Sequence, residues 1–176
     1  MPLLALLLLG QAAPPGDLPR TYRLTGTARV KALPFPVRDQ EIHADAVVRA
    51  GPSPGELEIH LLVEGYACDL AATSQRGGAL RLAPGQNCRA LFSGEEAEGR
   101  IEASLASGAG RLDEEALSLE LVFTIGGSVR MREGGALDAL GQALSLPGSG
   151  GSWTAVKGEA RGRAEGRRDR SRAAGG

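Results

Sequence analysis

Aromatic residues are scarce in this chain. Among 176 residues there are three Phe, two Tyr and one Trp, together 3% of the sequence. A hydrophobic core must therefore be built from Leu, Val, Ile and Ala, and each buried large aliphatic side chain contributes roughly 1.5 to 3 kcal/mol. Six aromatics are also too few for the two girdles of an outer-membrane barrel.

Long apolar runs, cysteines and histidines are scarce as well. The apolar run from Leu3 to Leu9 has seven residues, whereas a membrane-spanning helix needs roughly 20. The two cysteines alone would leave a zinc site short of ligands. No serine lies in a Ser-x-x-Lys pattern. Ser53 has the Gly-x-Ser-x-Gly spacing in Gly51–Gly55, but its neighbours are prolines in an expected turn between two strands, whereas a nucleophile elbow joins a strand to a helix. We therefore expect no catalytic residue and no cofactor.

The first 13 residues have the composition of a signal peptide. The apolar run ends at Gly10 and Ala12, small residues that signal peptidase accepts, so we expect cleavage after residue 12 or 13. No Lys or Arg precedes the leucines, and a buried N-terminal strand or helix is the alternative interpretation. A cleaved signal would make the mature protein periplasmic or extracellular, with residues 14–20 as a linker and no integral membrane segment.

Apolar or small residues alternate with polar ones along most of the remaining chain. This period of two is typical of strands with one buried face. The 26 glycines and 10 prolines supply turns and argue against a helical bundle. The alternation covers residues 22–32, 42–50, 56–64, 68–72, 80–82, 101–105, 117–131 and 154–163.

This pattern predicts a single all-β domain over residues 21–164. We expect an antiparallel β-barrel or β-sandwich of about 8 to 10 short strands, and the pattern does not distinguish the two. The last strand is expected to pair with the first and close the sheet. Leucines at helical spacing predict one short helix over residues 136–144. Residues 165–176 lack apolar periodicity and are predicted to form a disordered basic tail.

The two cysteines, Cys68 and Cys88, are predicted to form a structural disulfide. Cys68 begins one arm of an expected hairpin and Cys88 follows the turn that ends the other arm. An oxidising compartment favours their pairing. Closing a loop of about 20 residues stabilises a fold by roughly 3 kcal/mol in the chain-entropy model.

His43 and His60 lie on the outer faces of two strands that are expected to pair. Imidazole and carboxylate form a credible metal-ligand set, but the spacing matches no metal motif, and we favour two solvated histidines. The neighbouring carboxylates are Glu41, Asp45, Glu58 and Glu64.

The C-terminal region is rich in arginine. Between Lys157 and Arg172 there are seven basic and three acidic residues. Guanidinium groups suit phosphate and carboxylate, so an anionic envelope polymer or lipid headgroup is a candidate partner, with a solvated tail as the alternative. The region has no aromatic residue for base stacking, so we expect no nucleic acid. The candidate arginines are Arg161, Arg163, Arg167, Arg168, Arg170 and Arg172.

These observations favour an exported, soluble, noncatalytic binding or structural protein of the cell envelope. A barrel that binds a small apolar ligand is the first alternative, although aromatic residues that usually line such pockets are few. An eight-stranded outer-membrane barrel and a hydrolase on a β scaffold are weaker alternatives. For the hydrolase, the acidic clusters at 95–98 and 113–115 are the candidate paired carboxylates.

Overall fold

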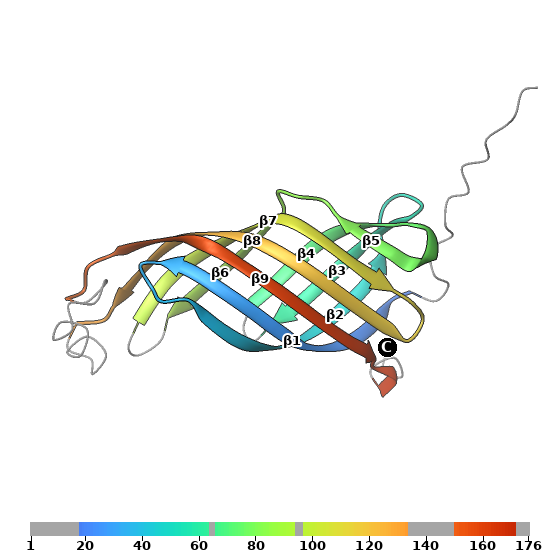
Figure 1. The fold of residues 1–176 in the computed structure, drawn as a ribbon, viewed down its shortest axis with the longest axis horizontal. Coiled ribbons are helices and arrows are strands. Elements are labelled where there is room, and N and C mark those ends of the chain that lie inside the picture. The colour runs from blue at the N-terminus through green and yellow to red at the C-terminus, as the bar shows by residue number, and fades with distance from the viewer. Residues whose placement is uncertain (1–17, 64–65, 94–96, 134–149, 172–176) are drawn as a thin grey trace, which may run out of the picture.

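A computed structural model describes residues 18–63, 66–93, 97–133 and 150–171. In this part of the chain nine strands form one antiparallel sheet that closes on itself (Figure 1). The strands are β1 (Arg20–Leu33), β2 (Arg38–Ala50), β3 (Glu56–Val63), β4 (Tyr66–Ser74), β5 (Ala79–Leu82), β6 (Asn87–Ser93), β7 (Ala97–Leu112), β8 (Ala116–Met131) and β9 (Thr154–Arg168). A 3₁₀ turn, η1 (Arg76–Gly78), lies between β4 and β5.

The sheet is a barrel and not a sandwich. Each strand from β1 to β4 pairs with the next, β9 pairs with both β1 and β8, and β5 closes the ring by pairing with β7. β5 and β6 are successive segments at one strand position, because β5 pairs with the C-terminal part of β7 and β6 with its N-terminal part. The predicted pairing of the first and last strands is therefore confirmed.

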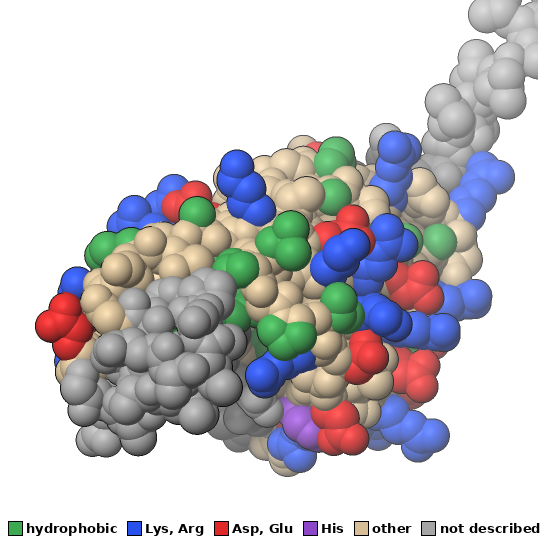
Figure 2. Space-filling view, turned by 60° about the vertical axis from the view of Figure 1, so that its left-hand side comes forward, with side chains coloured by type: hydrophobic (Ala, Val, Ile, Leu, Met, Phe, Trp, Pro, Cys, Tyr) green, Lys and Arg blue, Asp and Glu red, His purple; other side chains and the backbone are tan. Residues whose placement is uncertain are grey.

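Inward-facing side chains pack most tightly at the end of the barrel that holds β5. The alternation seen in the sequence places aliphatic side chains inside and charged ones outside. Figure 2 shows basic and acidic side chains spread over the exterior with smaller hydrophobic groups between them. The largest side chains that are almost completely buried are Tyr22, Leu24, Val48, Leu57, Ile59, Leu70, Leu105, Leu117 and Leu119.

Toward the other end of the barrel the inward-facing side chains are less buried. Val30, Ile101, Phe123 and Ile125 are only half-buried there, although Val156 is 3% exposed. The inward positions of β9 are occupied by glycine and alanine. The interior is thus dense at the β5 end and more open to solvent at the end where β1 meets its turn to β2.

A buried polar cluster lies at the β5 end. The Tyr22 hydroxyl donates a hydrogen bond to the backbone carbonyl of Asp113 at 3.1 Å, and Arg20 donates to the same oxygen at 3.5 Å. The Asp113 carboxylate accepts hydrogen bonds from the backbone amides of Glu115 and Ala116, at 2.9 and 2.6 Å, and so shapes the β7–β8 turn. The cluster ties the start of β1 to this turn.

Side chains close a seam between β4 and β6. The β4–β5 ladder covers Ala72–Ser74, and the pairings of the described strands include none between β4 and β6. The Gln86 amide takes the place of a peptide group: its nitrogen donates to the carbonyls of Ala71 at 3.0 Å and Ala83 at 2.6 Å, and its oxygen accepts from the Ala71 amide. Backbone groups at this edge would otherwise lack partners.

The predicted disulfide joins the same two strands. Cys68 of β4 and Cys88 of β6 are bonded, with their Cα atoms 5.0 Å apart. The bond lies beyond Gln86 along the seam, so a side-chain amide and a covalent bond together do what a backbone ladder does elsewhere in the barrel.

Several boundaries differ from the sequence-based expectation. Five strands have 13 or more residues, so they are not short. β9 continues to Arg168, past the expected domain end at 164, because Ala164 and Gly166 continue the inward series without being strongly apolar. The expected signal peptide at 1–13 and helix at 136–144 lie outside the described residues.

Among the residues that the structure describes, no helix combines the length and apolar content that crossing a bilayer requires.

Replacing Gln86 by Ala should destabilise the barrel, because the Ala71 amide loses its partner and the Ala71 carbonyl keeps only the Ala83 amide, at 3.4 Å. We expect the free energy of unfolding to fall by about 1 to 2 kcal/mol, measured by urea denaturation. The exposed Gln40 of β2 provides a matched control, and Gln40→Ala should change stability by less than about 0.5 kcal/mol. Equal effects of the two substitutions would contradict the role assigned to Gln86.

Replacing Tyr22 by Phe should lower the free energy of unfolding near neutral pH by about 1 kcal/mol, through loss of the hydrogen bond to Asp113. Burial raises the pKa of the Tyr22 phenol, and a hydrogen bond with Arg20 offsets part of that rise. Above the ordinary value of 10.0 the unfolded chain releases this proton first. The stability contributed by the buried phenol is therefore complete below that pH and is lost as pH rises through the folded pKa.

The stability difference between wild type and Tyr22→Phe should accordingly narrow as pH rises from about 8 to about 11. Urea titrations followed by circular dichroism across this range check the prediction. A difference that stays constant over the whole range would show that the phenol does not titrate differently in the two states.

Candidate functional site

Arginines face each other across the β1–β9 ladder. Arg23 lies opposite Arg167, and Arg29 lies opposite Arg161. Like charges directly opposite one another destabilise a sheet. All four side chains point to the exterior of the barrel, where solvent screens but does not remove the repulsion. Strand pairing alone does not favour this arrangement.

The outward positions of β1 and β9 form a basic surface, here called the β1–β9 face. It carries seven basic side chains and two acidic ones, whereas the outer positions of β2, β3 and β4 hold six acidic side chains and one basic one, Arg49. The basic members of the β1–β9 face are Arg23, Arg29, Lys31, Lys157, Arg161, Arg163 and Arg167, and its acidic members are Glu159 and Glu165. The acidic side chains on the other strands are Asp39, Glu41, Asp45, Glu56, Glu58 and Asp69.

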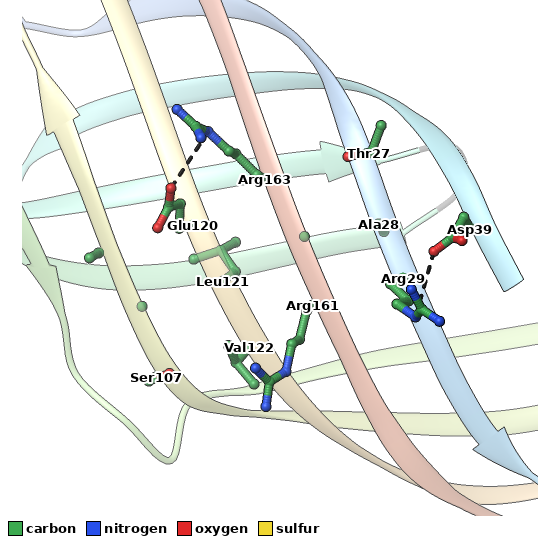
Figure 3. Close-up of a pocket in the computed structure, with 13 residues that line it drawn as sticks. Thr27, Ala28, Arg29, Asp39, Ser107, Glu120, Leu121, Val122, Arg161 and Arg163 are labelled. Atoms are coloured by element: carbon green, nitrogen blue, oxygen red, sulfur yellow. Dashed lines mark ion pairs between the residues drawn. The ribbon is translucent and has the colours of Figure 1, made fainter. Parts of the chain in front are cut away.

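A shallow groove crosses the middle of the β1–β9 face. Figure 3 shows Arg29 of β1 and Arg161 and Arg163 of β9 around it, with Val122 of β8 beside Arg161. Its volume is about 650 Å³. The uncharged lining residues that face outward include the small Thr27, Ser107 and Ala109, which leave space beside the longer arginines.

Each arginine at the groove has an acidic neighbour. Arg163 lies 3.5 Å from Glu120 of β8 and Arg29 lies 3.9 Å from Asp39 of β2 (Figure 3). Arg161 donates a hydrogen bond to Glu159 at 2.6 Å.

These contacts are exposed to solvent, and exposed ion pairs contribute little to stability. The hydrogen bond from Arg161 holds the pKa of the Glu159 carboxyl below its usual value, so this acid stays ionised at neutral pH. A phosphate or carboxylate oxygen of a ligand can replace an exposed carboxylate at a guanidinium group with little loss.

The predicted basic residues divide into three groups. Arg161, Arg163 and Arg167 lie on the β1–β9 face. Arg168 ends β9, and Arg170 pairs with Glu115 beside the β7–β8 turn. Arg172 lies outside the described residues. The structure therefore brings half of the predicted set together, on a strand and not on a free tail.

Sequence reasoning missed the contribution of β1. Arg23, Arg29 and Lys31 occupy the outward positions of the first strand, and the pairing of β1 with β9 sets them beside the arginines of β9. The signal was present in the alternation of residues 22–32 together with the expected pairing of first and last strands. The alternation does not give the register of the two strands, and the register decides which basic residues lie opposite each other.

The structure does not bring His43 and His60 together. Val47 lies opposite His60 in the β2–β3 ladder, which leaves His43 four residues away along β2. His60 instead contacts Asp69 at 2.5 Å, and His43 lies 4.0 Å from Glu41. Within the described residues no group of three His, Cys, Asp or Glu side chains can hold a metal ion.

The acidic clusters considered for hydrolysis have other partners. Glu98 forms ion pairs with Arg130 and Arg132, and the Asp113 carboxylate binds backbone amides of its own turn. Residues 94–96 lie outside the described part of the chain. Glu98 and Asp113 thus have structural partners, and none of these contacts involves a nucleophile.

Comparison with known proteins adds no family to this geometry. No protein-family model, curated protein or solved structure matches the chain. The arrangement of the side chains is therefore the basis for a functional assignment.

Proposed function

We propose that this chain is an exported, noncatalytic protein of the cell envelope that binds an anionic polymer along the β1–β9 face. The observation that carries the proposal is the placement of Arg29 opposite Arg161 and of Arg23 opposite Arg167. Carboxylates already offset part of the repulsion, since Arg23 hydrogen-bonds Asp169 at 3.0 Å and lies 4.0 Å from Asp45. An anionic ligand between the members of each pair would offset it further. Guanidinium groups bind phosphate and carboxylate oxygens with two parallel hydrogen bonds.

The spacing of the arginine pairs favours a linear ligand. Along β1, Arg23 and Arg29 are six residues apart, and so are Arg161 and Arg167 along β9. At about 3.4 Å per residue the two pairs are separated by roughly 20 Å. A single small anion can reach one pair, whereas a chain with repeated phosphate or carboxylate groups can reach both. Arg163, which lies between the pairs opposite Thr27, supports the same path.

The disulfide supports the exported part of the proposal. Disulfides persist in oxidising compartments and are rare in the cytosol, and Cys68 and Cys88 are joined in the barrel. The composition of residues 1–13 favours the same location. Periplasmic or extracellular polymers that carry phosphate or carboxylate groups are then the accessible ligands.

The charged exterior argues against the outer-membrane barrel. A barrel that spans a bilayer presents an apolar band to lipid. Here the outward positions of β1 and β9 carry nine charged side chains, and the interior holds the aliphatic residues.

A small apolar ligand is the second candidate. The observation that favours it is the contrast between the two ends of the barrel: Leu57 and Leu117 are at most 1% exposed at one end, while Val30 and Ile125 are half-buried toward the other. Inward-facing aliphatic side chains that solvent can reach are able to contact an acyl chain or a similar molecule.

The anionic-polymer proposal predicts binding of polyphosphate and of polygalacturonate in low salt, measured by isothermal titration calorimetry. Arg29→Gln combined with Arg161→Gln should weaken binding about tenfold or more, because two charge-assisted contacts are lost. Arg49→Gln combined with Arg81→Gln is the control, because it removes the same charge from exposed positions on other strands. It should change the affinity by less than about threefold, since solvent and salt screen exposed charges that lie far from the ligand.

Salt and the choice of polymer sharpen this test. Affinity for both polymers should fall as ionic strength rises, and a preference between them distinguishes phosphate from carboxylate recognition. Wild-type protein that binds neither polymer, or equal losses in the two double variants, would overturn the assignment to the β1–β9 face.

The second candidate predicts that a fluorescent fatty acid binds with saturable emission. Ala160→Phe would place a large ring at an inward position of β9, beside Phe123 and Val30 in the ladders, and should reduce this binding about tenfold. Glu159→Gln, the adjacent outward position, serves as the control. Undiminished binding in Ala160→Phe, with its fold verified by circular dichroism, would remove this candidate.

A further inference from the structure

Exposed apolar side chains gather at one end of the barrel. Among the residues that the structure describes, four large hydrophobic side chains are prominently exposed: Leu33 at 65%, Trp153 at 54%, Val37 at 45% and Leu62 at 42%. Leu62 is a single residue on the outer face of β3, which is ordinary for a protein surface. The other three lie at one end of the barrel, and exposed apolar groups on one side of a molecule can form a contact surface. Leu33, Val37 and Trp153 are called the rim here.

The strand topology places the rim residues together at the more open end. Leu33 is the last residue of β1, Val37 immediately precedes β2, and Trp153 immediately precedes β9. β1 and β9 are antiparallel, with Leu33 opposite Lys157. The C-terminal end of β1 and the N-terminal end of β9 therefore lie at the same end of the barrel (Figure 1).

The turn between β1 and β2 is suited to an apolar environment. Its amide donors are few, because Pro34 and Pro36 have no N–H, and the Phe35 amide donates to the carbonyl of Ala32 at 2.8 Å. Burying unpaired backbone donors in an apolar medium is costly. A turn with so few of them can enter such a medium at low cost.

Trp153 is held in place by its neighbours. The Arg130 guanidinium lies 4.9 Å from the centre of the indole ring, and Glu98 pairs with the same guanidinium. A side chain ordered in this way loses little entropy on binding. Tryptophan is also the residue that favours the boundary between headgroups and acyl chains.

Cations surround the rim. Lys31, Arg38 and Lys157 are exposed, and none of them forms an ion pair within the described part of the chain. Asp39 pairs with Arg29 and Glu159 with Arg161, although Lys31 also lies opposite Glu159 and interacts with it. Glu133 lies beside Gly151 at the same end. The exposed basic side chains beside the rim complement an anionic surface.

We propose that the rim docks on an anionic phospholipid bilayer, with Leu33, Val37 and Trp153 in the interface and the adjacent cations at lipid phosphates. Three apolar side chains are too few for a stable protein interface, which buries about 800 Å² on each partner. They suffice for interfacial attachment when electrostatic attraction adds to the apolar term. This inference does not depend on polymer binding. It would place the open end of the barrel at the membrane, with the β1–β9 face extending away from it.

Co-sedimentation with sucrose-loaded vesicles tests the inference. Wild-type protein should bind vesicles of equal phosphatidylglycerol and phosphatidylcholine, and bind phosphatidylcholine vesicles much less. Leu33→Ser combined with Trp153→Ser should weaken binding to the anionic vesicles at least about tenfold. Lys31→Gln combined with Lys157→Gln should weaken it about fivefold or more, and on anionic vesicles only.

Leu62→Ser is the control, because Leu62 is also an exposed leucine but lies on the outer face of β3, away from the rim. It should bind within about twofold of wild type, as expected for a surface change outside the contact. All of these proteins share residues 1–17, so any contribution of that segment cancels in the comparison. The rim residues are exposed, so their substitution should leave the fold intact, which circular dichroism verifies.

The outcomes separate this inference from the proposed function. Wild-type protein that stays unbound, equal binding to both vesicle types, or full binding by the Leu33→Ser, Trp153→Ser variant would each overturn bilayer docking. If polyphosphate binding persists in that case, the β1–β9 face assignment stands alone. If vesicles bind as expected and polyphosphate does not, only the polymer proposal falls.

Discussion

The close pairing of β1 with β9 closes the barrel and also fixes the positions of the arginines in the candidate site. The two strands approach so closely that a side chain at Gly26, Gly158 or Gly166 would overlap backbone atoms of the partner strand. Glycine has no Cβ, so these positions permit the approach. The same ladder fixes the register in which Arg29 meets Arg161. A slip of one residue would turn those arginines toward the interior, and the core therefore enforces an arrangement that the surface charges oppose.

Closure on the opposite side uses different chemistry for a related reason. The interior is aliphatic and poor in aromatics, so it supplies limited free energy to hold distant strands together. Where β4 and β6 form no backbone ladder, the Gln86 amide and the Cys68–Cys88 disulfide connect them. At the β5 end, Tyr22 and Arg20 anchor the β7–β8 turn. A thin core is thus supplemented by a few side-chain links at the places where the sheet is weakest.

The surface of the barrel is divided in a way that its interior does not require. The β1–β9 face is basic, the exterior of β2 to β4 is acidic, and the exposed apolar side chains of the rim lie at the end where Lys31 and Lys157 are found. Solubility would be met equally well by an even mixture of charges. The two proposals made above rest on this uneven distribution: bilayer docking on the apolar and basic groups at one end, and polymer binding on the basic β1–β9 face.

Much of the fold follows from alternation in the sequence, because the period of two is a property of the strand itself. The alternation of Leu57, Ile59 and Leu61 with polar residues predicts which face of this strand is buried, even when the neighbouring strands are not known. The disulfide was predictable for a similar reason, since only two cysteines exist to pair. The extension of β9 to Arg168 was missed because glycine and alanine mark an inward face only when another backbone lies close to it.

By itself the sequence determined the all-β character, the pair of cysteines and the excess of arginine near the C-terminus. Only the tertiary structure decided that the sheet closes as a barrel, that Arg23 and Arg29 join the arginines of β9, and that His43 and His60 stay apart. The physical reason is that alternation specifies which face of a strand is buried but not which strand lies beside it. Neighbours and register arise from packing and ladder hydrogen bonds between segments far apart in the chain, and these bring surface charges together.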